Sequence, residues 1–251
     1  MHMKATVYSI EGKALRQIDL PAVFESPRRG DLVKRAVLSE ESKLYQPKGH
    51  YPLAGLETSA RYRGRKEDFG TVKNKGIPHL PHEVLPKGQL GKVKRVPHAV
   101  KGRRAHPPKP QKKIVELINK KEHMKALASA LSFCADRDTV CGRAHTDIGM
   151  SIPIVLEGNF ERLAKTKDVE RVLGSLNLMK FLEKSKRNGT KSALIVVSSE
   201  NATKAGANLP GVDVVCAKSL TVKDLAPGTH PGRLTLFSES AIPEIAKRFS
   251  A

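Results

Sequence analysis

"SALIVVSS", residues 192–199, is the stretch that decides the fold of this chain. Its central residues, 193–197, are all apolar, so a strand formed there has no polar face to turn toward water. A second stretch of this kind is "VDVVCAK", residues 212–218. Strands that are buried on both faces are typical of parallel sheets whose two sides are covered by helices. The two stretches therefore predict a parallel α/β sheet.

Strands and helices alternate outward from this pair along the chain. Further strands are expected at 4–10, 14–20, 152–157 and 233–238. Helices are expected at 31–45, 111–135, 168–185 and 239–249, with a short helix near 201–207. Asp31 is expected to cap the first of these helices. The predicted fold class is α/β, with a mostly parallel sheet and helices on both faces.

A long basic segment interrupts this alternation after the first helix. Residues 46–113 contain 17 Lys and Arg against 4 Asp and Glu, so they carry +13 of the chain's net charge of +20. They also hold nine of the 16 prolines and eight of the 19 glycines, without a sustained helical or alternating period. An irregular insertion of this length is either disordered or functional. We expect a globular domain formed by 1–45 and 111–251, with 46–110 inserted as one extended loop.

The composition of the whole chain limits the class of protein. The 45 Lys and Arg against 25 Asp and Glu give a pI near 10, which indicates a polyanionic partner. Three cysteines at irregular spacing indicate a reducing cytosol rather than a disulfide framework. The first residues lack the apolar run of a signal peptide, and no stretch approaches 18 apolar residues, so no membrane contact is expected.

A doubly wound sheet often binds a nucleotide, but the glycine-rich phosphate loop of such folds is missing from the sequence. "KRNGTKS", residues 186–192, lacks the upstream glycine and is interpreted as a basic turn before a buried strand. Cys134, Cys141 and His145 do not have the spacing of a zinc site, and the two cysteines are expected in the core. We therefore expect no catalytic residue, no cofactor and no metal.

The basic segment is better explained as an RNA-binding surface than as a solvated face, because it has neither compensating carboxylates nor a helical period. RNA phosphates pair with Arg and Lys, while unstacked bases lie against rings and guanidinium planes. Histidine among Lys and Arg suits the same partner better than a metal. The candidate RNA-binding residues are the cationic, His and Tyr side chains of this segment: Lys48, His50, Tyr51, Arg61, Tyr62, Arg63, Arg65, Lys66, Lys73, Lys75, His79, His82, Lys87, Lys92, Lys94, Arg95, His98, Lys101, Arg103, Arg104, His106 and Lys109.

Four stretches together resemble large-subunit ribosomal protein four of the archaeal and eukaryotic type. They are residues 3–37, "HEVLPKGQLGKVKRVP" (82–97), "RVPHAVKGRRAHPPKP" (95–110) and "DLAPGTHPGRLTLFSESAI" (224–242). The resemblance covers essentially the whole chain, and its Gly-Arg-Arg-Ala-His-Pro-Pro core is specific. Because the long basic C-terminal extension of eukaryotic members is missing, an archaeal source is expected.

The resemblance implies a Rossmann-like domain from which the long loop threads through 23S-type rRNA. It also implies a structural, non-enzymatic and cytoplasmic role in the large ribosomal subunit, including help in subunit assembly. In the family the loop tip reaches the wall of the peptide exit tunnel, beside large-subunit protein twenty-two and the nascent peptide. Residues 101–110 resemble the returning arm of the loop, anchored on phosphates, and 58–70 are expected nearer its far end.

Two alternatives stay open at this point. One is a nucleotide-dependent enzyme that uses the loop as an RNA-recruiting arm, and the other is an RNA-binding regulator of its own message. One departure from the family also bears on RNA contact. Many archaeal relatives carry a second Gly- and Arg-rich insertion before the strand at 192–199, which is short here. The domain is therefore expected to depend more on the long loop and on Lys184, Lys186, Arg187 and Lys191.

Overall fold

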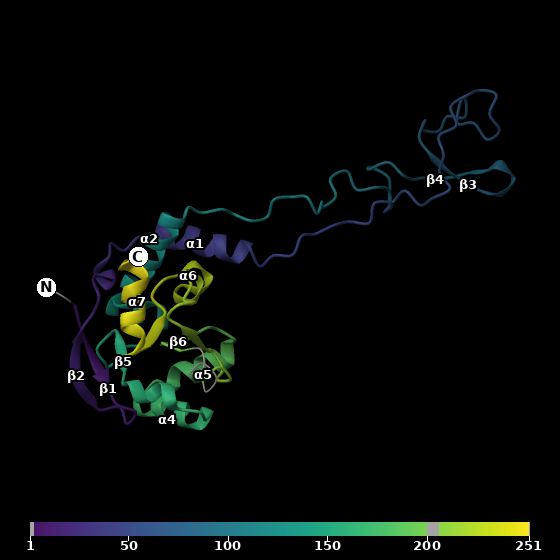
Figure 1. Ribbon diagram of the computed structural model, residues 1–251. Helices are drawn as coiled ribbons and strands as arrows, with labels where there is room; N and C mark the ends of the chain where they lie inside the picture. The colour runs from purple at the N-terminus through teal and green to yellow at the C-terminus, as the bar shows by residue number, and fades with distance from the viewer. Residues whose placement is uncertain (1–2, 200–205, 251) are drawn as a thin grey trace. The chain divides into compact units, whose positions relative to one another are not determined.

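The computed structural model describes residues 3–199 and 206–250 (Figure 1). The chain divides into two compact units. One comprises Met1–Leu44 and Val115–Ala251 and is called the α/β unit below. The other, Tyr45–Ile114, is called the basic unit. The basic unit nearly coincides with the segment in which the sequence concentrates positive charge.

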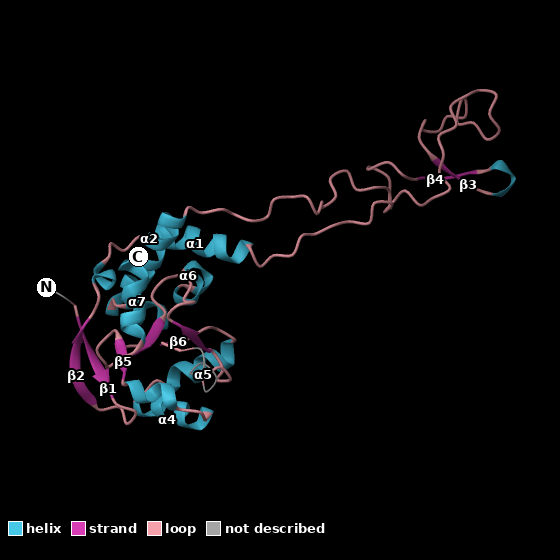
Figure 2. Cartoon of the chain, viewed as in Figure 1, coloured by secondary structure: helices cyan, strands magenta, loops and turns pink. Residues whose placement is uncertain are grey.

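The α/β unit is built on one six-stranded sheet, drawn in magenta in Figure 2. The strands lie in the order β2, β1, β5, β8, β6, β7. Their bounds are Lys4–Tyr8 for β1, Ala14–Asp19 for β2, Ile154–Leu156 for β5, Ala193–Val197 for β6, Val212–Cys216 for β7 and Leu234–Ser238 for β8. The pair β1 and β2 is antiparallel, and every other neighbouring pair is parallel. The predicted α/β class with a mostly parallel sheet is confirmed.

Strand β6 shows why a fully apolar run fits this sheet. Leu194 and Val196 pack into the hydrophobic cluster on one face. Ala193, Ile195 and Val197 pack into the cluster on the other face. Successive side chains of a strand point to opposite faces, so all of β6 is buried. Helices α1, α2, α6 and α7 contribute to the first cluster, and α3, α4 and α5 contribute to the second.

The helices follow the predicted alternation with two additions. Their bounds are Gly30–Ser42 for α1, Lys120–Cys134 for α2, Arg137–Ala144 for α3, Thr166–Ser175 for α4, Met179–Asn188 for α5, Val222–Leu225 for α6 and Ala241–Ser250 for α7. The sequence analysis did not predict α3 and α6, which are short and begin with side-chain caps. Asp136 accepts from the Thr139 amide at the start of α3, and Thr221 and Asp224 form a capping box at α6. Most of the short helix predicted near 201–207 lies outside the described residues.

The prediction of a single helix over 111–135 is wrong in its first third, because α2 begins only at Lys120. The preceding segment is held along α1 by its own backbone groups. The Ser39 hydroxyl donates to the Glu116 carbonyl, and the Glu116 amide donates to Ser42 Oγ at 2.9 Å. These bonds take the place of helical ones, and they leave Val115 and Leu117 exposed.

The helix predicted at 168–185 is in fact two helices, because the chain breaks between α4 and α5. Asn177 adopts a left-handed conformation with φ of 56°. Its amide donates to the Gly174 carbonyl and the Leu178 amide donates to Leu173, which is the Schellman arrangement that ends a helix. The break lets both Leu176 and Leu178 enter the core, although two residues spaced this way do not share one face of a helix.

The predicted cap at Asp31 is also wrong. Helix α1 begins one residue earlier, with Arg29 at the N-cap position and no side-chain cap. Asp31 lies in the first turn, where it pairs with Arg29 at 2.6 Å. A carboxylate in the first turn is still favourable for the helix dipole.

The basic unit contains one short antiparallel hairpin, formed by β3 (His82–Val84) and β4 (Leu90–Val93). A 3-10 turn at Pro86–Gly88 joins the two strands. Ala60 and Val72 are buried within the unit, together with His82. The expectation of one irregular loop is therefore corrected at this hairpin and the small packed centre beside it. Strands of three and four residues are too short to produce a recognisable alternation in the sequence.

Candidate nucleic-acid interface

Two arms of the basic unit run side by side, as Figure 1 shows. The Nδ1 atom of His50 lies 2.9 Å from the Pro108 carbonyl oxygen. Gly49 lies against the ring of Pro110, so closely that an added Cβ would be 3.2 Å from its Cγ. The prolines of the returning arm fix its backbone in an extended form. The first arm is therefore held against a stiff partner.

Glycines allow the two arms to touch where Arg103 and Arg104 begin. Gly55 has φ of +74°, and a Cβ there would lie 2.6 Å from the backbone of Gly102. At Gly102 itself an added Cβ would lie 1.9 Å from the Val96 carbonyl oxygen. No side chain fits at either position without a backbone shift. This contact fixes the point at which the two arginines leave the arm, and both arginines are exposed.

Beyond this contact the unit is closed by backbone hydrogen bonds around its buried centre. The Arg61 amide donates to the His82 carbonyl at 3.1 Å, and the two residues form an isolated bridge. The Arg95 guanidinium donates to the Ala60 carbonyl at 3.3 Å. The Val84 amide donates to the Ser59 hydroxyl at 3.2 Å. The residues from 59 to 95 thus form one ordered module.

The structure places 19 of the 22 candidate side chains on the surface of this unit. The exposed candidates lie along both arms and around the ordered module: Lys48, His50, Tyr51, Arg61, Tyr62, Arg65, Lys66, Lys73, Lys75, His79, Lys87, Lys92, Arg95, His98, Lys101, Arg103, Arg104, His106 and Lys109. Exposure is what a contact to an external polyanion requires. The selection of these residues from charge and spacing is consistent with the geometry.

Three candidates have structural contacts instead. His82 is 5% exposed, and its Nδ1 atom lies 2.7 Å from the Leu80 carbonyl oxygen. It therefore belongs to the packed centre, and we remove it from the candidate contact set. Arg63 donates to the Phe69 carbonyl at 2.6 Å, and Lys94 donates to the Val100 carbonyl at 3.2 Å. Both side chains are half-buried, so part of their hydrogen-bonding capacity is used inside the unit.

The electrostatics of the two units differ sharply. Among the described residues of the α/β unit, thirteen ion pairs form. Across 45–114, all of which the structure describes, no Lys or Arg forms an ion pair with a carboxylate. The acidic Glu57 is engaged by the Tyr51 hydroxyl, and this hydrogen bond raises the pKa of Tyr51. The net charge of +13 is therefore not neutralised from within.

One residue that the sequence analysis left out of the candidate set is Phe69. Its ring lies against Gly88, where an added Cβ would be 2.5 Å from ring carbons, yet the side chain is 77% exposed. An aromatic ring that is held on one side and open on the other is a stacking platform for a base. The signal in the sequence was a Phe within a basic, glycine-containing stretch, and only the cationic, His and Tyr side chains of that stretch were selected.

Carboxylates lie at the carboxyl ends of the parallel strands, where a nucleotide would bind. In open α/β sheets, ligands bind at the carboxyl ends of the strands. There Glu161 accepts hydrogen bonds from the Ser198 amide and hydroxyl and from the Ser240 hydroxyl. Burial opposes ionisation of Glu161, but these hydrogen bonds outweigh it and lower its pKa. Glu157 and Glu239 line a pocket at the same ends of the strands, together with Arg16 and Arg162, and Arg16 pairs with Glu239.

The other chemistry-bearing residues form no site among the described residues. Cys134 and Cys216 are buried and Cys141 is half-buried, as expected for core thiols. In the described ranges, no three His, Cys, Asp or Glu side chains are placed to hold a metal ion. No helix in the described part of the chain is both long enough and apolar enough to cross a membrane.

The basic turn before β6 is only partly available to a partner. Lys186 and Arg187 are exposed at the end of α5. Lys191 pairs with Asp213 on β7. The side chain of Lys184 lies outside the described set. Of the four side chains expected to contact RNA here, Lys186 and Arg187 are therefore exposed to an external anion.

Comparison with known proteins gives matches over almost the whole chain. The family described as "Ribosomal protein L4/L1 family" matches residues 18–248. Large ribosomal subunit protein uL4 of Methanocaldococcus jannaschii is 43% identical over 265 aligned positions, which cover 98% of this chain and 100% of the relative. The proteins of the same name from Haloquadratum walsbyi and Haloarcula marismortui are 38% and 37% identical, with the same coverage. All three relatives are archaeal, which agrees with the expected archaeal type.

Proposed function

The chain belongs to the ribosomal protein L4/L1 family, and from that premise we propose that it is a structural constituent of the large ribosomal subunit. It acts in the cytoplasm as part of the ribosome. It binds 23S-type rRNA through the basic unit and assists assembly of the subunit. This function requires binding and shape, and no catalytic residue takes part in it.

The observation that carries the proposal is the unpaired charge of the basic unit. Its 17 Lys and Arg meet 4 Asp and Glu and no ion pair forms among the residues 45–114. Self-repulsion at this charge density opposes a compact arrangement, and RNA phosphates relieve it as counterions are released. A protein that worked without a polyanion would gain stability by pairing some of these charges.

The geometry suggests how the unit divides the contacts. Arg103 and Arg104 leave the arm at the close contact between Gly55 and Gly102, so their positions are fixed before binding. A planar guanidinium can then bind a phosphate with two parallel hydrogen bonds, which Lys cannot do. Tyr62 and Phe69 are exposed in the module at 59–95 and are assigned to stacking.

We extend the proposal to the neighbours that the family resemblance implies. The module at 59–95 forms part of the wall of the peptide exit tunnel, beside large-subunit protein twenty-two and the nascent peptide. What supports this assignment is its position between the two arms in the chain and its exposed apolar side chains, Phe69 and Leu85. Residues 49–55 and 102–110 act as the anchoring arms.

The two alternatives have less support. A nucleotide-dependent enzyme of this fold would need a glycine-rich phosphate loop at the carboxyl ends of the strands, and the sequence lacks one. A regulator of its own message would use the same RNA-binding surface. The two RNA-binding functions therefore differ in the RNA that is bound and not in the site.

Expression of the tagged chain in Methanococcus maripaludis tests the proposal, because the uL4 proteins of that organism are 40 to 41% identical to it. We expect the chain to sediment with large subunits in a sucrose gradient, and quantitative mass spectrometry to give near-stoichiometric occupancy. A variant with 46–113 replaced by a Gly-Ser linker should remain at the top of the gradient. Crosslinked RNA is sequenced in parallel.

A control variant and the crosslinked RNA distinguish the structural role in the ribosome from the regulator of its own message. A matched variant, Arg16→Ala with Arg171→Ala, removes two paired charges from the α/β unit and should keep full occupancy. Recovery of the wild-type chain only at the top of the gradient contradicts the structural role. Crosslinks confined to its own message, with no enrichment of rRNA, favour the regulator.

A further inference from the structure

A small pocket opens at the amino ends of β6 and β8, on the opposite edge of the sheet from the carboxylates described above. It has a volume of about 80 Å³ and is lined by α3, α5 and the residues that precede the two strands. One water needs only about 10–15 Å³, so the pocket has room for a small anion. Its polar lining residues are Arg143, Thr190, Lys191 and Ser192, and the Ser192 hydroxyl donates to the Gly211 carbonyl at 3.2 Å. No Asp or Glu is among the described residues that line the pocket.

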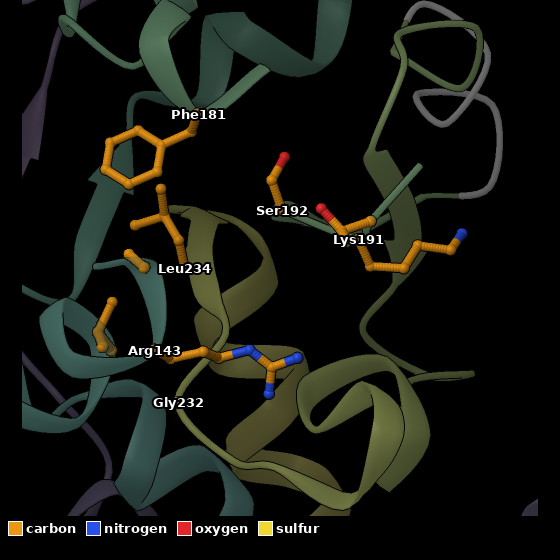
Figure 3. Close-up of a pocket in the computed structure, with 9 residues that line it drawn as sticks. Arg143, Phe181, Lys191, Ser192, Gly232 and Leu234 are labelled. Atoms are coloured by element: carbon orange, nitrogen blue, oxygen red, sulfur yellow. The ribbon is translucent and has the colours of Figure 1, made fainter. Parts of the chain in front are cut away.

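Arg143 is the unusual residue of this pocket. Figure 3 shows its side chain extending from α3 to the same side of the pocket as Ser192 and Lys191. Its Nη2 atom donates to the Pro227 carbonyl at 2.9 Å. Its Nη1 atom is buried and has no hydrogen-bond partner among the residues that the structure describes. Burial and the charge of Arg233 lower the pKa of Arg143, and no carboxylate counteracts them.

Arg233 places a second guanidinium in the same region. Its side chain is 1% exposed, and it donates to the Ala193 carbonyl at 2.7 Å and to the Asp213 carboxylate at 2.8 Å. Asp213 also pairs with Lys191, so one carboxylate serves two cations. The Nε atom of Arg233 is buried without a partner.

The charge at this edge is therefore incompletely balanced. Lys191 and Arg233 share the single carboxylate of Asp213, and Arg143 forms no ion pair with a carboxylate among the described residues. Buried charged groups are normally paired, because removal from water costs several kcal/mol for an unpaired ion. The buried Nη1 atom of Arg143, which lacks an acceptor among the described residues, marks the place in this pocket where an acceptor is missing. Arg233, whose Nε atom also lacks one, lines a neighbouring pocket.

We propose that this pocket binds a phosphate group, with Arg143 as its principal ligand and the Thr190 and Ser192 hydroxyls beside it. A phosphate offers several acceptor oxygens and the negative charge that the three cations lack. The source we assign is a backbone phosphate of rRNA, and this part of the inference rests on the proposed function. The pocket would be a second RNA contact, on the α/β unit and independent of the basic unit.

Thermal unfolding of the full chain, with inorganic phosphate as the probe, tests the site. Phosphate is titrated against chloride at constant ionic strength. We expect a saturable rise in Tm, reaching about 5 °C or more when phosphate is 100-fold above its Kd. Arg143→Met should lose this saturable part. Arg171→Met removes an exposed, ion-paired arginine and should keep it. Phosphate also stabilises proteins by exclusion from their surface, and the unsaturable rise that remains in Arg143→Met measures that effect.

A second comparison guards against a merely structural role for Arg143. Without phosphate, Arg143→Met should have a Tm equal to or above that of the wild type, because it removes an unpaired charge. A lower Tm together with an unchanged phosphate response overturns the proposal. If Arg143→Met does not fold, the wild-type titration decides alone. A rise in Tm that increases without saturation, as surface exclusion gives, also overturns the proposal.

Binding of an rRNA fragment identifies the source of the phosphate. A tenfold or larger loss of rRNA affinity in Arg143→Met supports the RNA backbone. Unchanged rRNA affinity, with the phosphate response lost, supports free phosphate as the ligand of the same site. A wild-type chain that responds to phosphate but binds no rRNA refutes the proposed function and leaves the site in place.

Discussion

Replacement of Arg103 and Arg104 by Ala separates binding from folding more cleanly than any other change in the basic unit. Both side chains are exposed, and neither forms a hydrogen bond or ion pair within 45–114 as described. Surface substitutions of this kind change the free energy of unfolding by no more than about 0.5 kcal/mol. The variant should therefore fold as the wild type does.

The expected loss of rRNA binding follows from the number of contacts removed. A hydrogen bond to a charged group contributes about 1.5 to 3 kcal/mol, so the loss of one from each arginine costs about 3 to 6 kcal/mol. Since each 1.4 kcal/mol is a factor of about ten, Kd should rise at least about 100-fold. Two fewer phosphate contacts should also make the slope of log K against log salt shallower by about 1.4 to 1.8.

Fluorescence anisotropy with a labelled rRNA fragment measures Kd at several salt concentrations, and urea unfolding measures stability in parallel. The control is Arg16→Ala with Arg171→Ala, which removes the same charge from the α/β unit. The reasoning is refuted if both double variants lose affinity equally. It is refuted as well if the loss for Arg103 and Arg104 is matched by a loss of stability.

Two further predictions concern single residues. Gly102→Ala introduces a Cβ that would lie 1.9 Å from the Val96 carbonyl oxygen. The rRNA affinity should therefore fall at least tenfold, while the α/β unit keeps its Tm. Unchanged affinity in the binding assay would contradict the assigned contact between the arms. Glu40→Gln should destabilise the α/β unit by about 1.5 to 3 kcal/mol at pH 7, because the Glu40 carboxylate accepts from His123 and from the Val222 and Lys223 amides. Burial opposes ionisation of Glu40, but these bonds outweigh it and lower its pKa, so its stabilisation is complete above the ordinary value of 4.5 and is lost as the pH falls through the folded value. Urea unfolding between pH 3 and 7 should show the difference between wild type and variant disappearing at the acid end, and a difference that persists there would contradict this assignment.

The sheet could be predicted because its signal is local. A run such as Ala193–Val197 can be buried only where helices cover both faces, and that condition leads directly to a parallel α/β sheet. The strands at 212–218 and 233–238 and the helix at 239–249 have signals of the same kind. Each is found in the structure within a few residues of the expected bounds.

The errors occurred where a tertiary contact or a turn overrode the local period. The apolar spacing from Ile114 to Ile118 continues that of α2, but hydrogen bonds from Ser39 and Ser42 hold the backbone at Glu116 outside any helix. These two serines lie more than 70 residues earlier in the chain, so no local pattern reveals them. The break at Asn177 did have a local sign, because Asn is one of the few residues that adopt a left-handed conformation readily.

The candidate interface was predictable in composition and only partly in shape. Net charge and proline content located the segment and nearly all of its exposed cations. The burial of His82 could not be foreseen, because it depends on the bridge to Arg61 and on packing beside Ala60 and Val72. The unpaired Arg143 had no sequence signal either, since only the three-dimensional structure shows that no carboxylate faces it.

The salt dependence of rRNA binding by the full chain tests most directly the claim that unpaired cations of the basic unit bind RNA. If about six to ten of its 17 Lys and Arg contact phosphates, log K should fall with log salt at a slope of about −5 to −9, by analogy with duplex DNA. Affinity should then drop by about a thousandfold or more between 50 and 200 mM salt. A nearly flat titration, or one whose slope is unchanged when 46–113 is replaced by a Gly-Ser linker, would contradict the claim.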